Sequence, residues 1–405
     1  MNKITPHVFF FLLLSFLYGL PILLTLFFDL NDDMPYVSDE ILSEFKETRW
    51  IVLWIYIISF ISFITGSYIT RKWISNKMII KNILTNNTHF IKSNNSLKLG
   101  ERLFIYFLIF SGFILFIIMY KSGALSVSYM ESFEHGVVSQ NMFTVFCDIY
   151  IYIYIYLWHN YDKKYKNIKI LLFMFIAITV FKGSRMFTIP IVFFILYRNI
   201  YVEKISRKKI IHLSFFLSIT LIGLFSMFFI RHNSSIDEKE LTPLLLLLIQ
   251  YESCGVHIPL MKEILLGFHT SFAPIFTIIT DTILFLVPRF IFPSKNNYLY
   301  FDTLMDKYNL SPFGGTNGEA SIILYFGILF PLAFIIIGSF FSYIYTLSKT
   351  IKYKYIEPLY IYLCCSLLFT FLRNGILIVL KNIILIIIII YILNIVKRIT
   401  FKIKK

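Results

Sequence analysis

Long runs of apolar residues alternate with short polar loops along almost the whole chain. Ten of these runs are long enough for helices that cross a bilayer, which takes about 20 residues per crossing. Helices satisfy every backbone polar group inside a bilayer, where water is absent. The pattern predicts an all-α polytopic membrane protein, with residues 1–405 as a single integral membrane domain. The predicted spans are 8–28, 50–69, 103–120, 140–158, 166–183, 185–202, 210–230, 320–347, 356–372 and 376–396.

One stretch has the periodicity of a strand. The run IYIYIYIYLW at 149–158 alternates with period two, which in water is typical of a half-buried strand. Because it lies within a predicted span, we interpret it as helix, with a Tyr–Trp belt at one membrane interface.

The charges follow the loops in alternation. The chain carries a net charge of +15, while only 15% of its residues are charged and 58% are hydrophobic. Loops on one side hold 25 Lys and Arg residues and 4 Asp and Glu residues. The other side holds 13 Lys and Arg residues and 18 Asp and Glu residues. Basic loops mark the cytoplasmic face, so both termini are predicted to be cytoplasmic. This distribution explains the positive charge by topology and argues against nucleic acid as a partner.

One outer loop is far longer than the rest. Residues 231–319 lie between two predicted spans and contain the apolar runs 241–251 and 273–292. The first run is too short to cross a bilayer, and the second is interrupted by prolines and charges. We expect interfacial or re-entrant helices that form a lid over the outer face.

Two cations interrupt an apolar stretch in VFKGSRMF, residues 180–187. The loops before and after this stretch are predicted to be cytoplasmic, so KGSR is the outer tip of a helical hairpin. Each arm has about 13–15 apolar residues, roughly 20–23 Å, against a hydrocarbon core of about 30 Å. The tip is therefore expected to lie recessed in the outer leaflet. Its cations either bind an anion or only end the helix by reaching toward the headgroups.

Further cations lie at or below the same predicted outer boundary. A cluster of this kind suits a lipid-borne phosphate or pyrophosphate, because Arg offers a bidentate fork and Lys a point charge. The candidate anion-binding residues are Lys182, Ser184, Arg185, Arg231, Arg289, Lys295, Arg373 and Lys381, and the glycines expected to let backbone approach the ligand are Gly183, Gly314 and Gly315.

A carboxylate or histidine is needed to take a proton from an acceptor hydroxyl. Glu319 follows the flexible GGTNG segment and is the first candidate, although a carboxylate in a first helical turn also stabilises the helix dipole. His232 is the second candidate. Glu252 and His257 are weaker ones, and Asp148 and Asp281 either pair structurally or line a sugar groove.

These segments together resemble the O-antigen polymerase and oligosaccharide repeat-unit polymerase families. The resemblance rests on GSR at an outer tip, then LVPRFIFPSKNN at 286–297, GGTNGEASIILYFGILFP at 314–331 and RNGILIVLKNIIL at 373–385. The order of these motifs, with a long loop before the eighth span, strengthens the match. It implies an all-helical architecture similar to the lipid-carrier-dependent glycosyltransferases of the GT-C class.

The resemblance also implies an activity and a location. Such enzymes polymerise repeat units carried on undecaprenyl pyrophosphate at the periplasmic face of the bacterial inner membrane, without a metal, nucleotide sugar or other cofactor. The resemblance does not decide whether a chain-length regulator binds as a protein partner. A polysaccharide flippase or exporter, and an O-antigen ligase, are the alternatives. Transporters of that kind usually have related halves and short outer loops, and this chain has no repeat and one dominant outer loop.

Overall fold

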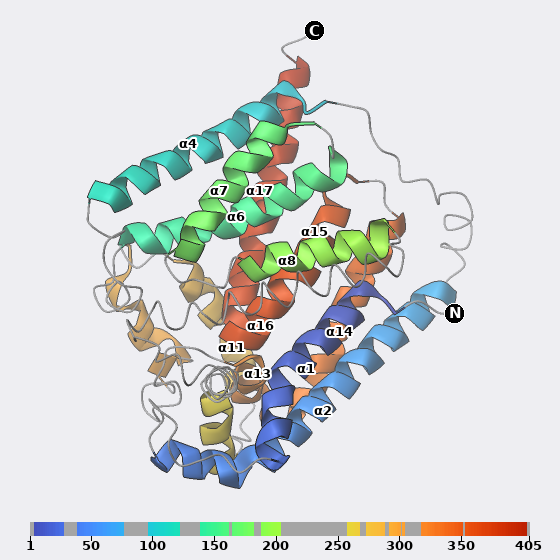
Figure 1. Ribbon diagram of the computed structural model, residues 1–405, viewed down its shortest axis with the longest axis vertical. Coiled ribbons are helices and arrows are strands. Elements are labelled where there is room, and N and C mark those ends of the chain that lie inside the picture. The colour runs from blue at the N-terminus through green and yellow to red at the C-terminus, as the bar shows by residue number, and fades with distance from the viewer. Residues whose placement is uncertain are drawn as a thin grey trace, which may run out of the picture. The chain divides into compact units, whose positions relative to one another are not determined.

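The computed structural model describes twelve stretches of the chain (Figure 1). They are residues 4–27, 39–76, 96–121, 138–161, 164–181, 188–203, 257–267, 273–287, 291–300, 302–303, 317–350 and 353–402.

Within these stretches the regular structure is helical and no strand occurs. The elements in chain order are α1 (Pro6–Phe27), α2 (Asp39–Asn76), α4 (Leu99–Lys121), α6 (Val138–Asn160), α7 (Lys166–Phe181), α8 (Thr188–Tyr197), the π-helix η1 (Arg198–Val202), α11 (Ala273–Leu286), the 3-10 helix η3 (Pro293–Tyr298), α13 (Gly318–Phe326), the 3-10 turn η4 (Gly327–Leu329), α14 (Phe330–Thr350), α15 (Ile356–Tyr362), the π-helix η5 (Leu363–Leu367), α16 (Leu368–Asn374) and α17 (Ile376–Lys402).

The predicted spans correspond to these helices. Nine of the ten coincide with described helices, and the run 210–230 lies outside the described residues. Within the described residues, five helical stretches are long and apolar enough to cross a membrane: Lys46–Ile74, Leu99–Lys121, Gly318–Thr350, Ile356–Asn374 and Ile376–Lys397. An all-α membrane protein is therefore supported, while ten crossings and the sidedness of the termini stay predictions.

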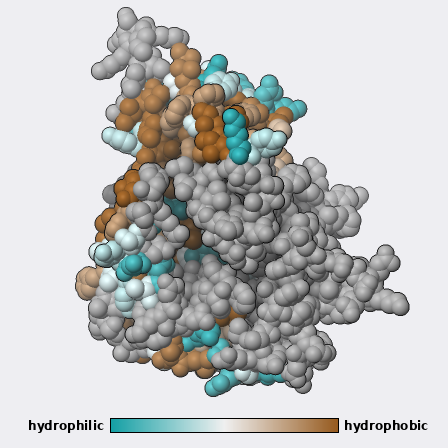
Figure 2. Space-filling model, turned by 90° about the vertical axis from the view of Figure 1, so that its left-hand side faces the viewer, coloured by the Kyte–Doolittle hydropathy of each residue, from teal (hydrophilic) through white to brown (hydrophobic). Residues whose placement is uncertain are grey.

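Large apolar side chains lie on the outside of the helices. On α4, Leu103, Phe107 and Phe110 are exposed, and hydrophobic surface is visible in Figure 2 over part of one face of the molecule. A protein in water rarely exposes apolar surface of this extent, whereas a lipid-facing helix does so at no cost. The exposed apolar residues thus agree with a bilayer around the helices.

The chain forms two compact units, and each collects segments from distant parts of the sequence. The first unit contains residues 1–78, 236–346 and 367–381. The second contains residues 79–235, 347–366 and 382–405. Neither unit is a contiguous stretch of chain.

In the first unit, two glycines let α2 and α14 approach to backbone contact. A β-carbon at Gly66 would collide with the Ile335 carbonyl oxygen, and one at Gly338 with the Phe63 carbonyl oxygen. Gly66 thus contacts the residue three positions before Gly338, and Gly338 contacts the residue three positions before Gly66. Small residues at a helix crossing permit the close van der Waals packing on which helix association in membranes depends.

In the second unit, α6 packs against α4, α7, α8 and α15. The alternating Tyr run is helical, as predicted, and Tyr150 donates a hydrogen bond to the Leu108 carbonyl at 2.8 Å. Helices α7 and α8 contact each other and flank residues 182–187, which lie outside the described residues, so the hairpin with KGSR at its tip stays a prediction.

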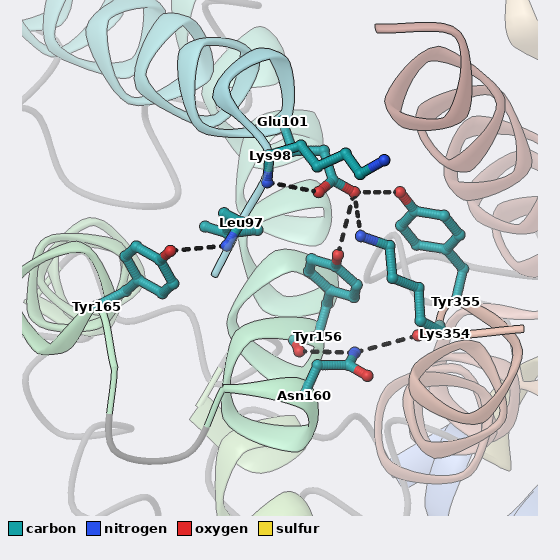
Figure 3. A network of polar contacts seen from close by, with 8 residues as sticks. All are labelled: Leu97, Lys98, Glu101, Tyr156, Asn160, Tyr165, Lys354 and Tyr355. Carbon is teal, nitrogen blue, oxygen red and sulfur yellow. Dashed lines mark hydrogen bonds and ion pairs between the residues drawn. The ribbon is translucent and has the colours of Figure 1, made fainter. Parts of the chain in front are cut away.

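A buried carboxylate joins three elements of the second unit (Figure 3). Glu101 accepts a hydrogen bond from the Lys98 backbone N–H at 3.2 Å, which caps the first turn of α4. Its other oxygen accepts hydrogen bonds from the Lys354 ammonium and from the Tyr355 and Tyr156 hydroxyls. The carboxylate is fully buried, so these donors replace the water it has lost.

Lys354 and Tyr355 lie between predicted spans, and burial shifts the pKa of both side chains. Burial lowers the pKa of the Lys354 ammonium, and the hydrogen bond to Glu101 opposes that shift. Burial and the Glu101 carboxylate both raise the pKa of Tyr355. Asn160 completes the network by donating to the carbonyls of Tyr156 and Lys354, each at 3.1 Å.

Candidate functional site

The start of α13 is fixed by its N-cap residue. The Asn317 side-chain oxygen accepts a hydrogen bond from the Ala320 N–H at 3.1 Å, as expected for asparagine at this position. This bond sets the orientation of the amide, so its nitrogen points the other way and donates to the Tyr56 hydroxyl of α2 at 2.8 Å. The cap therefore links the first turn of α13 to α2.

Glu319 lies in that first turn and is completely buried. Its carboxylate oxygens make no hydrogen bond of normal geometry with the described residues, although the Tyr56 hydroxyl lies within reach of the carboxylate. The positive end of the helix dipole favours a carboxylate here, but it does not replace the lost hydration of a buried charge. A buried carboxylate with unmet oxygens is a candidate for chemistry rather than a typical structural acid.

Tyr56 is the neighbour that acts on Glu319. Its hydroxyl accepts the hydrogen bond from Asn317, so the hydroxyl hydrogen is left to face another acceptor, and Tyr56 interacts electrostatically with the Glu319 carboxylate. The ring of His257 stands edge-on to the Tyr56 ring, with centroids 5.2 Å apart. Asn317, Tyr56 and Glu319 thus form one buried polar group, with His257 beside it.

The first turn of α13 is seated on the last turn of α16. A β-carbon at Gly318 would lie 2.6 Å from the Phe371 carbonyl oxygen and 3.1 Å from the Leu372 Cα, so only glycine fits here without displacing backbone. Arg373 lies in that same last turn. The structure therefore brings Glu319 and the helix end that carries Arg373 together, although 53 residues separate them in sequence.

A second contact holds the start of α17 in place. Ser321 accepts a hydrogen bond from the Ile376 N–H at 3.0 Å and donates to the Gly318 carbonyl at 2.7 Å. Between α16 and α17 the chain turns at Gly375, whose φ of 82° favours glycine. This turn sets the position of α17, which carries Lys381.

Two of the predicted cations meet at one aromatic ring. The ammonium groups of Lys295 and Lys381 each lie 5.4 Å from the centroid of Phe285 in α11. Lys295 also donates to the Phe285 and Val287 carbonyls at 3.3 and 2.6 Å, so it caps the C-terminal end of α11. Lys295 therefore has a structural role in addition to any role in binding.

Asp281 has hydroxyl and amide partners. It accepts hydrogen bonds from the Tyr325 hydroxyl at 2.5 Å and from the Tyr300 N–H at 3.1 Å. These bonds tie α11 to α13 and to the segment after η3. The sequence left open whether Asp281 pairs structurally or lines a sugar groove, and these contacts favour the structural role.

Ten predicted candidates fall outside the described residues. The residues that lie outside the described parts of the chain are Lys182, Gly183, Ser184, Arg185, Arg231, His232, Arg289, Gly314 and Gly315, and the weaker candidate Glu252. The sequence analysis missed Tyr56 and Asn317. The N-cap role of Asn317 could have been predicted, since asparagine directly before the start of a helix is typical of an N-cap.

The described residues do not assemble a metal site. Among them, no three His, Cys, Asp or Glu side chains lie together in a way that could hold a metal ion. The polar groups of the site are the buried carboxylate, its Tyr and Asn neighbours, and the cations Arg373, Lys295 and Lys381.

The chain matches no family model, no curated protein and no solved structure. The arrangement of the site residues offers a proton acceptor beside a helix end that carries a guanidinium group, and two ammonium groups elsewhere in the same unit. Such a set can stabilise a leaving anion and take a proton from a hydroxyl.

Proposed function

We propose that this chain is a metal-independent glycosyltransferase of the bacterial inner membrane, which polymerises oligosaccharide repeat units carried on undecaprenyl pyrophosphate. The observation that supports it most is Glu319, a fully buried carboxylate beside the Tyr56 hydroxyl, held against the helix end that carries Arg373. The motif resemblance to O-antigen polymerases supplies the substrate class and the periplasmic side of the membrane.

In the proposed reaction, a hydroxyl at the non-reducing end of a new lipid-linked unit attacks the anomeric carbon of the growing chain. The bond from that carbon to the pyrophosphate oxygen breaks, and undecaprenyl pyrophosphate leaves with the bonding electron pair. Glu319 takes the proton of the attacking hydroxyl. Arg373 and Lys381 stabilise the charge on the leaving pyrophosphate, together with the sequence-predicted Arg289.

The buried neighbours of Glu319 have a positioning role in this scheme. Asn317 is locked by its bond to Ala320 and orients Tyr56, and Tyr56 in turn faces the carboxylate. Because Glu319 is fully covered, the acceptor reaches it only when substrate binding opens a path. Closure of the site around the substrate would then exclude water and prevent simple hydrolysis.

Loss of the protein tests the proposal against its alternatives. Cells that lack it should carry single repeat units on lipid and no ladder of longer chains. If all surface glycan were lost, single units included, a flippase or a ligase would be the better account. Full function of a Glu319→Gln variant would remove Glu319 from the proposed reaction.

A further inference from the structure

Cations from three distant parts of the sequence meet at one place in the second unit. Lys98 directly precedes α4, Lys354 lies two residues before α15, and Lys397 lies in α17. Lys354 interacts electrostatically with both Lys98 and Lys397. The ends of three predicted spans thus form one basic surface, away from the residues of the proposed reaction.

Arg102 belongs to the same basic surface. Its backbone N–H donates to the Lys98 carbonyl at 3.0 Å, so the two residues lie one helical turn apart. Its guanidinium group stands over the Tyr165 ring, 5.6 Å from the ring centroid, and its Nε makes no hydrogen bond of normal geometry with the described residues. Stacking on an aromatic ring orients the guanidinium group without using its N–H donors.

Glu101 balances only part of this positive charge. Its carboxylate pairs with the Lys354 ammonium (Figure 3). Glu357 is the acid that follows Lys354 in the sequence, and it pairs with Lys349 at 2.8 Å and with His159 at 3.2 Å. The other three cations of the surface therefore leave an excess of positive charge. Like charges gathered in this way repel one another, and an anion among them relieves the repulsion.

An exposed apolar stripe begins directly beside these cations. On α4, Leu99, Leu103, Phe107 and Phe110 follow one another at spacings of four, four and three residues, which places them on one face of the helix. Each of these side chains is between 57% and 63% exposed, whereas other parts of α4 contact α6 and α7. A ligand that fits both features carries an anionic group joined to hydrocarbon chains.

The predicted position in the membrane selects the same class of ligand. The four cations lie at the cytoplasmic ends of the predicted spans 103–120, 356–372 and 376–396. Basic pockets between membrane helices on this side suit anionic lipid headgroups. Arginine contacts phosphate oxygens through a bidentate fork, and lysine adds a point charge. A soluble anion would use the cations but leave the apolar stripe uncovered, so the combination favours a phospholipid.

We propose that Lys98, Arg102 and Lys397 bind the headgroup phosphate of an anionic phospholipid in the cytoplasmic leaflet, with Lys354 held beside them by Glu101. The acyl chains of this lipid lie along the apolar stripe of α4, and the bound lipid stabilises the second unit. This site is independent of the proposed glycosyl transfer, which uses residues of the first unit.

The test is thermal unfolding of the purified full-length protein in a neutral detergent, titrated with phosphatidylglycerol. The melting temperature should rise saturably, because a lipid that binds only the folded state stabilises it. Phosphatidylcholine has no net charge, and inorganic phosphate has no chains to cover the stripe, so neither should reproduce the rise. The proposal is overturned if phosphatidylglycerol gives no rise, or if either control gives a rise of the same size.

Substitutions show where the lipid binds. Lys98→Gln and Lys397→Gln should each increase the phosphatidylglycerol concentration needed for half of the rise about fivefold, which corresponds to the contribution of one basic residue near a membrane surface. Lys98→Arg keeps the charge and should retain the wild-type value. Lys72→Gln is the matched control, since Lys72 is an exposed lysine near the end of α2 in the first unit and is also predicted to be cytoplasmic.

The Lys72→Gln variant should bind phosphatidylglycerol as the wild type does. Equal weakening by Lys72→Gln and Lys98→Gln would indicate attraction to the whole basic face and would overturn the site. Wild-type values for both Lys98→Gln and Lys397→Gln would overturn it as well.

Discussion

Gly318 lies against the backbone of Phe371 so closely that a β-carbon at position 318 would stand 2.6 Å from the Phe371 carbonyl oxygen. This contact seats the turn with Glu319 on the turn with Arg373. A backbone oxygen cannot move aside as the end of a flexible side chain can, so the contact fixes how the two helix ends approach.

Gly318→Ala should therefore separate the proposed base from the helix end that carries Arg373. Because misplacing reacting groups by about 1 Å can cost about a hundredfold in rate, we expect a loss of that order in chain growth per folded molecule. Gly338→Ala is the control, since a β-carbon on Gly338 of α14 would collide with the Phe63 carbonyl oxygen of α2. It should lower the melting temperature but leave the rate per folded molecule near wild type. Equal rates for Gly318→Ala and wild type would show that this contact does not position the reaction.

Lys295 and Lys381 share the Phe285 ring but should differ on substitution. Lys295 caps α11 through two carbonyls, so Lys295→Met should lower stability by about 1–2 kcal/mol. Lys381→Met should instead weaken binding of the lipid-linked donor, and Lys381→Arg should restore part of it. Donor binding and thermal unfolding of the purified variants measure the two effects separately. Normal donor binding by Lys381→Met would remove Lys381 from the proposed cation set.

The Glu101–Lys354 pair should be structural. Lys354→Met leaves the buried Glu101 carboxylate without its counter-ion, which costs about 3–5 kcal/mol. Glu101→Gln leaves a partly exposed Lys354 ammonium unpaired and should cost less. The double variant should be more stable than the sum of the two single effects predicts, because it leaves no unpaired charge. Denaturation of all three variants gives the coupling energy, and strictly additive effects would refute a paired role.

Glu263 should make stability depend on pH. It is buried in the helical stretch 257–265, and burial raises its pKa well above 4.5. Between the pKa of the unfolded chain and the higher pKa of the folded state, the folded state binds more protons. The contribution of Glu263 to stability is therefore unfavourable, grows as the pH rises from about 4.5 toward the folded-state pKa, and is constant above it. Glu263→Gln should raise the melting temperature at pH 7.5 and change it little near pH 4.5. A rise of equal size at both pH values would contradict this linkage.

The helices were predictable because apolar runs decide where a chain can enter a bilayer. Even the alternating Tyr run at 149–158 is helical, since its position in a long apolar run outweighs its period. The π-helix η5 was not predicted, because a single i→i+5 turn leaves no trace in a hydrophobic pattern of period 3.6.

The site was predictable only in part. Glu319 could be selected from the GGTNGEA segment, but its partner Tyr56 could not. Asn317 and Tyr56 are 261 positions apart, and the chain has 27 tyrosines, so nothing local distinguishes this one. Glu101 and Lys354 are likewise 253 positions apart. Such pairs are defined by tertiary packing, which one sequence does not reveal.

The central claim is that Glu319 takes a proton while cations such as Arg373 hold the pyrophosphate. The two roles separate in a reconstituted system that contains the purified protein and lipid-linked repeat units. Arg373→Ala should weaken donor binding and slow growth by about a hundredfold, about 3 kcal/mol, and Arg373→Lys should restore only part of it.

The most direct measurement is chain growth by Glu319→Gln in that system, with donor binding measured in the same preparation. The variant keeps the shape of the side chain and loses its basicity. We predict normal donor binding and a rate of chain growth at least about a hundredfold lower than that of wild type. Normal binding with wild-type growth would contradict the account and leave Glu319 as a carboxylate that only stabilises the start of α13.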